Sequence, residues 1–134
     1  MADFKKAHAK TSKNEGGYVN NSADKGKETY RGIASAFFPK WEGWTIVHVA
    51  IKALGIESTL DCPRSVRKQI DDTLAQSPEL ASMVDEFYKK NFWDKLNLDS
   101  EPSQLIAEEI FDTAVNNGVG TAKAMIEKVR KNVT

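Results

Sequence analysis

Glu15-Gly16-Gly17-Tyr18 ends one regular segment of this sequence and begins another. Before it, residues recur at the three-to-four spacing of one helical face, which predicts a first helix carrying Phe4, Ala7, His8 and Thr11. The two glycines favour the end of that helix, because glycine adopts left-handed or open backbone conformations without a Cβ penalty. We therefore expect Glu15 at the C-terminal end of the first helix, facing the turn-rich segment that follows.

Residues 17 to 33 break the helical pattern. A polar run from Asn20 to Lys27 separates two short β-forming segments, Tyr18-Val19 and Thr29 to Ile33. This pattern predicts a small β-hairpin after the first helix. A long polar loop in a compact domain is more often functional than decorative, so the hairpin is the natural place for a site.

The rest of the chain reads as five further helices. Pro63 and Pro78 suit helix starts, where a missing N–H is not needed, Ser103 suits an N-cap, and Gly118 suits a helix end. The apolar stripes run through Trp44–Leu54, Val66–Leu74, Leu80–Tyr88, Ile106–Ala114 and Thr121–Val129. The sequence thus predicts a mostly α single domain, with the aromatic group Phe37, Phe38, Trp41 and Trp44 in its core rather than stacked on carbohydrate.

The composition is that of an ordinary globular protein of 134 residues, enough for one domain. Lys plus Arg (19) balances Asp plus Glu (19), which excludes the charge footprint of nucleic-acid or anionic-membrane binding. The N-terminus lacks the apolar core of a secretory signal, and the stretch from Trp44 to Ile56 is too short to span a bilayer. The lone Cys62 cannot form an internal disulfide. We expect synthesis in the cytoplasm without a signal peptide and without membrane insertion.

The stretch from Glu15 to Ile33 resembles the signature of glycoside hydrolase family 108, the lysozyme-like N-acetylmuramidases found as phage endolysins and secretion activator proteins. The resemblance rests on Glu15, Gly16-Gly17, Asp24, Thr29 and Gly32-Ile33, in that order. Where the family commonly has two glycines, this chain has Gly26-Lys27. Tyr88–Asp94 and Phe111–Gly118 resemble the predicted peptidoglycan-binding segment that usually follows in this family. The resemblance implies a lysozyme-like single domain over residues 1–134, with a catalytic segment at 1–84 and a peptidoglycan-binding segment at 85–134.

Glu15 is the predicted general acid. A glycosidic oxygen leaves poorly unless it is protonated, so the donor needs a raised carboxyl pKa, which burial near helix C-terminal carbonyls favours. Asp24, in a polar loop, should stay ionised, and one raised plus one ordinary carboxyl is the division of labour of glycoside hydrolysis. Thr29 is expected to orient the attacking water. The Glu, Asp and Thr arrangement resembles that of phage-type lysozymes, which favours an inverting route.

Tyr18, Tyr30 and Asn116 are the predicted substrate-binding residues. For Tyr18 a packing role is the alternative, and for Asn116 a helix-capping role. His8 and His48 lie on apolar helical stripes, which favours satisfied core or boundary positions. Zinc-like spacing of His, Cys and carboxylates is absent from the sequence, so we expect neither metal nor cofactor.

The expected function is a muramidase that cleaves the β-1,4 bond between N-acetylmuramic acid and N-acetylglucosamine. Its partner would be the peptidoglycan glycan strand in the cell wall (periplasm). The protein would reach it after lysis, or after export by a holin or secretion apparatus, and would act as a monomer. Two alternatives stay open: a lytic transglycosylase, disfavoured by Asp24 and Thr29, and a non-catalytic peptidoglycan-binding or secretion-accessory module. A reducing end, an anhydro end or no product distinguishes the three.

Overall fold

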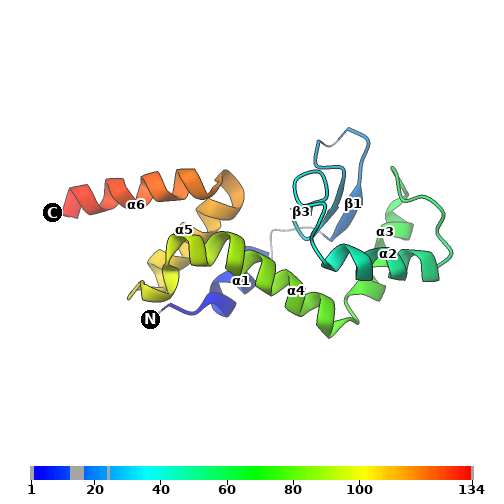
Figure 1. Cartoon of the computed structure of the whole chain (residues 1–134), viewed down its shortest axis with the longest axis horizontal. Helices are drawn as coiled ribbons and strands as arrows, with labels where there is room; N and C mark the ends of the chain where they lie inside the picture. Colours follow the sequence, from blue (N-terminus) through cyan, green and yellow to red (C-terminus); the bar gives the residue numbers. More distant parts are fainter. Residues whose placement is uncertain (1, 13–16, 24, 134) are drawn as a thin grey trace. The chain divides into compact units, whose positions relative to one another are not determined.

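The computed structural model describes residues 2–12, 17–23 and 25–133 (Figure 1). These residues form six α-helices and a small antiparallel sheet that follows the first helix, which confirms the predicted mostly helical fold. The chain divides into two compact units. We call residues 15–84 the sheet unit, and residues 1–14 together with 85–134 the helical unit. The assignment of catalysis to residues 1–84 and of peptidoglycan binding to residues 85–134 stays a prediction.

The sheet unit holds three strands in the order β1-β2-β3 and two helices. The predicted hairpin is formed by β1 and β2, with Tyr18 opposite Tyr30 and Asn20 opposite Glu28. A third strand was not predicted, because two residues are too few to show a period of two. The elements are β1 (Tyr18–Asn20), β2 (Glu28–Tyr30), β3 (Ile33–Ala34), α2 (Gly43–Ala53) and α3 (Arg64–Leu74).

The two faces of this sheet carry different side chains. Because neighbouring residues of a strand point to opposite faces, Tyr18, Glu28 and Tyr30 share one face, whereas Thr29 lies on the other with Val19. Tyr18 and Tyr30 are only 1% and 6% exposed, so their face of the sheet is the buried one.

The helical unit is built around a cluster of rings. Phe4 packs against His8, Trp93 and Phe111, with ring centroids 5.3 to 5.7 Å apart. His8 is buried and its Nδ1 lies 2.8 Å from Asp85, as predicted for a satisfied core histidine. The elements are α1 (Phe4–Ser12), η1 (Lys89–Trp93), η2 (Asp94–Leu96), η3 (Leu98–Ser100), α5 (Gln104–Asn117) and α6 (Val119–Val133); α4 (Pro78–Tyr88) contains the boundary between the units.

The predicted helix boundaries are largely confirmed. The Ser103 hydroxyl accepts a hydrogen bond from the Ile106 amide (3.3 Å) at the start of α5, and Gly118 ends that helix at φ 97°. Pro63 directly precedes α3, and Pro78 is the first residue of α4. These short-range signals act within one turn, which is why sequence alone reveals them.

The aromatic group of the sheet unit is only partly in the core. Trp44 is buried, and its indole Nε1 donates a hydrogen bond to the Phe38 carbonyl (3.0 Å). Phe37, in contrast, is 69% exposed, so the core position predicted for it is wrong. It falls between β3 and α2, where no strand or helix period fixes the direction of a side chain.

Candidate functional site

Two of the three predicted catalytic residues, Glu15 and Asp24, lie outside the described residues. The described part of α1 ends at Ser12, and β1 begins at Tyr18. Thr29 occupies the centre of β2, and its hydroxyl donates a hydrogen bond to the Lys27 carbonyl (3.1 Å). Its part in the chemistry stays a prediction.

The predicted substrate-binding residues belong to different units. Tyr18 and Tyr30 are buried in the sheet unit, and this burial raises the pKa of both phenols. For Tyr18, burial favours the packing alternative. Asn116 lies in the last turn of α5 in the helical unit, where its side chain donates a hydrogen bond to the Asp112 carbonyl one turn earlier (2.9 Å).

Gly17 leads into β1 and lies in close approach to the side chain of Asp71. A Cβ on Gly17 would lie 2.3 Å from Asp71 Oδ1, and this same oxygen accepts a hydrogen bond from the Tyr18 amide (2.7 Å). This contact gives a steric reason for glycine at position 17, whereas the predicted helix stop at Gly16-Gly17 stays a prediction. Asp71 belongs to α3, so Gly17 lets this helix hold the first strand.

Glu28 is the carboxylate that sequence reasoning missed. Its Oε2 accepts a short hydrogen bond from the Tyr18 hydroxyl, and its Oε1 lies 2.6 Å from His48 Nε2. Tyr18 Oη lies 2.7 Å from Thr59 Oγ1, which accepts from the Asn20 side-chain amide (3.0 Å). An ionised carboxylate only accepts, so Tyr18 donates to Glu28, and Thr59 must donate to Tyr18. The network therefore runs from Asn20 through Thr59 and Tyr18 to Glu28, with every bond oriented the same way.

His48 takes the second of its two predicted positions, at the boundary of the core. Its side chain is 56% exposed, so it is not a core residue. The imidazole stacks on Trp44, which lies one turn earlier in α2, with ring centroids 5.8 Å apart. Its Nε2 also binds the carboxylate of Glu28 in β2. The apolar spacing of α2 correctly placed His48 near Trp44, but did not reveal that the ring sits at the edge of that stripe, beside a carboxylate.

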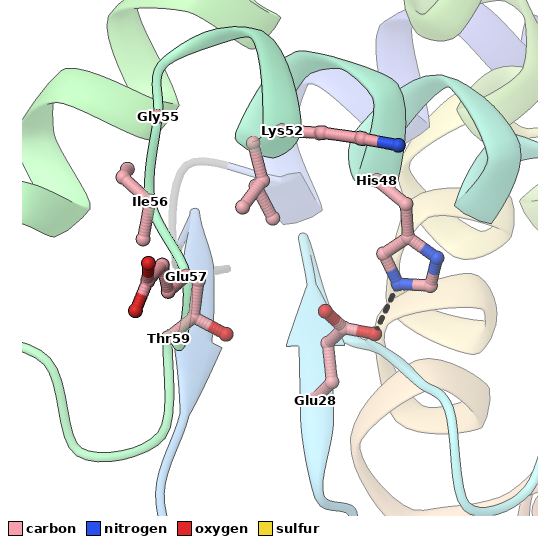
Figure 2. Close-up of a pocket in the computed structure, with 8 residues that line it drawn as sticks. Glu28, His48, Lys52, Gly55, Ile56, Glu57 and Thr59 are labelled. Carbon is pink, nitrogen blue, oxygen red and sulfur yellow. Dashed lines mark hydrogen bonds and ion pairs between the residues drawn. The ribbon is translucent and has the colours of Figure 1, made fainter.

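These groups border an open pocket of about 640 Å³ in the sheet unit. Figure 2 shows Glu28 and His48 joined on one side of it and Glu57 and Thr59 on the other. Its lining consists of Glu28, His48, Ile51, Lys52, Gly55, Ile56, Glu57 and Thr59. It lies on the Tyr18 face of the sheet, whereas Thr29 lies on the opposite face. Thr29, the one described residue of the predicted hydrolytic site, therefore does not face the pocket.

In the part of the chain that the structure describes, no three His, Cys, Asp or Glu side chains gather closely enough to hold a metal ion. Among the same residues, no helix has both the length and the apolar character needed to cross a membrane.

Comparison with known proteins gives one match. The sequence matches the family described as Glycosyl hydrolase 108 over residues 8–118, a range that includes β1 to β3 and most of both units. Neither the curated proteins nor the solved structures give a match. Because the matched range covers most of the 134 residues, the chain belongs to the glycosyl hydrolase 108 family, a family of glycosidases.

Proposed function

We propose that this glycosyl hydrolase is an N-acetylmuramidase that cleaves the β-1,4 bond between N-acetylmuramic acid and N-acetylglucosamine. The observation that carries the proposal is the family match over residues 8–118, which spans the stretch with Glu15, Asp24 and Thr29. Glu15 and Asp24 supply the pair of carboxyl groups that hydrolysis of a glycoside uses, and Thr29 adds a hydroxyl that can orient water.

In the proposed reaction, Glu15 transfers its proton to the glycosidic oxygen as the bond from that oxygen to the anomeric carbon breaks. Asp24 accepts a proton from a water molecule that Thr29 helps to orient, and the water oxygen bonds to the anomeric carbon from the opposite face. The product is a reducing sugar of inverted configuration. Asn116 is kept as a proposed substrate contact.

The positions of Glu28 and Thr29 on opposite faces of the sheet support the proposed role of Thr29 in orienting water. Glu28 is held by Tyr18 and His48 on the buried face, so its carboxylate is committed to the network there. Thr29 projects from the other face, where its hydroxyl is bound to a carbonyl of its own strand segment. A hydroxyl that donates to Lys27 keeps its two lone pairs as acceptors for a water molecule.

The partners and place of action are part of the proposal. The substrate is the peptidoglycan glycan strand in the cell wall, reached after lysis or through a holin or secretion apparatus. The protein would act as a monomer.

The test is digestion of purified peptidoglycan, followed by mass spectrometry of the released fragments. A muramidase leaves reducing N-acetylmuramic acid ends. Anhydro ends would show a lytic transglycosylase instead, and undigested glycan together with sedimentation of the protein on the sacculi would show a binding module. Either of these two results would overturn the proposal.

A further inference from the structure

The pocket of the sheet unit contains two opposite charges that the protein does not neutralise. Lys52 and Glu57 both line it. Within the described ranges 2–12, 17–23 and 25–133, neither side chain has a hydrogen-bond or ion-pair partner. Figure 2 shows Glu57 on one side of the pocket, and Lys52 extending from α2 toward the other side, near His48.

Glu28 and His48, which also line the described pocket, bind each other. Glu28 Oε1 is bound by His48, and Glu28 Oε2 is bound by Tyr18. The Glu28 side chain is only 18% exposed, which further limits it as a ligand for a charged group. The charges offered to a ligand are therefore one ammonium, from Lys52, and one carboxylate, from Glu57.

The remaining surface of the pocket suits a small aliphatic group. Ile51 is 8% exposed and belongs to the core of α2, and Ile56 is half-buried on the facing loop. Among the described residues, the lining includes no Phe, Tyr or Trp. A sugar ring would thus find no aromatic face for stacking, whereas a methyl side chain would find two isoleucines.

We propose that this pocket binds a short zwitterionic peptide, with a carboxylate of the ligand at Lys52, an ammonium at Glu57 and a small aliphatic side chain against Ile51. Peptide stems of peptidoglycan have this chemistry, so the identification of the natural ligand rests on the proposed function. The pocket lies on the face of the sheet opposite Thr29, so a stem held there would anchor the substrate on the other side of the sheet from Thr29. Such remote contacts contribute binding energy that an enzyme can use at the reacting centre.

The test is calorimetric titration of the whole protein with stem peptide released from peptidoglycan by an amidase. Lys52→Met and Glu57→Gln should each weaken binding by about threefold to tenfold, as expected for one partly shielded ion pair. Lys40→Met and Glu42→Gln are the matched controls, because both residues are exposed in the sheet unit and neither lines the pocket. The controls should bind as the wild type does.

Modified peptides identify which charge meets which residue. Amidation of the peptide carboxylates should weaken binding to the wild type but not to Lys52→Met, and acetylation of the amine should weaken binding to the wild type but not to Glu57→Gln. Absence of binding to the wild type, or equal losses in the two variants and their controls, would overturn the proposal. The glycosidase proposal is tested separately on glycan strands freed of peptide: peptide binding without cleavage refutes the activity alone, and cleavage without peptide binding refutes the pocket alone.

Discussion

Glu28 and Thr29 are neighbours in β2, but their side chains leave the sheet on opposite faces. Glu28 is bound by Tyr18 and His48 and helps to hold the strand against α2. Thr29 faces away from this network, and its hydroxyl contacts only the Lys27 carbonyl among the described residues. One strand thus separates a structural carboxylate from a hydroxyl proposed to act in the chemistry.

This separation predicts different losses for the two side chains. Thr29→Val keeps the shape of the side chain and removes the hydroxyl, so kcat should fall by about tenfold or more while the melting temperature changes little. Glu28→Gln should lower the free energy of unfolding by about 1–3 kcal/mol, because the network loses its ionised acceptor. Turnover of sacculi and urea unfolding, measured on both variants, check this. A Thr29→Val enzyme with wild-type kcat would remove Thr29 from the mechanism.

Tyr18→Phe should lower the free energy of unfolding by about 1–3 kcal/mol, because Glu28 Oε2 loses its donor and the Thr59 hydroxyl loses the acceptor of its proton. It should also change the dependence of stability on pH. Burial and the bond to Glu28 raise the pKa of Tyr18 in the folded protein. The unfolded chain therefore loses this proton first, and stability is fully present below about pH 10 and declines above it.

Urea titrations between neutral and alkaline pH test this sign. The free energy of unfolding should fall less steeply with rising pH in the variant than in the wild type. Part of the fall should remain, because burial also raises the pKa of Tyr30. An identical alkaline slope in both proteins would mean that Tyr18 is not protected from ionisation by the fold.

Gly17→Ala should destabilise the protein by about 1–3 kcal/mol, because the added methyl would overlap the Asp71 carboxylate that holds the Tyr18 amide. Gly120→Ala is the matched control: nothing lies within 4 Å of its Cβ position, and the residue is in α6. The control should be unchanged or more stable by up to about 1 kcal/mol. Equal melting temperatures for the two variants would contradict the close approach.

Lys27→Gly should raise the free energy of unfolding by up to about 1 kcal/mol. Lys27 has φ 59°, a left-handed conformation that costs a residue with a Cβ about 1–2 kcal/mol. Glycine removes this cost, but it also raises the entropy of the unfolded chain, which offsets part of the gain in stability. Lys40→Gly removes the same charge where φ is not left-handed, and should be neutral or destabilising. If both variants lose stability equally, backbone strain at Lys27 is not the cause.

How far the sequence predicts this fold depends on the range of each interaction. The start of α5 at Ser103 and its end at Gly118 were predictable, because a cap and its partner lie within one turn. The network around Glu28 was not, because Tyr18 and Thr59 are 41 positions apart and only the folded strand brings them together. The same holds for His48, which meets a carboxylate 20 positions earlier.

The irregular segment from η1 to η3 was missed for another reason. Trp93 and Leu98 are buried there, and Asn97 takes a left-handed conformation, but π and 3₁₀ turns repeat no period long enough to read from a sequence. Support for the candidate hydrolytic site comes mainly from the sequence, because Glu15 and Asp24 fall outside the residues that the structure describes. Their roles rest on the order of residues in a stretch that the family match covers.

The most direct test of the central claim is the rate at which Glu15→Gln digests purified peptidoglycan. Glutamine keeps the size and the hydrogen bonding of the side chain but has no dissociable proton for the leaving oxygen. General acid catalysis contributes roughly 10²–10⁴-fold, so the rate of reducing-end release should fall by at least about 100-fold, with an unchanged melting temperature and Glu42→Gln as an active control. Wild-type digestion by Glu15→Gln would show that Glu15 is not the acid and would contradict the account.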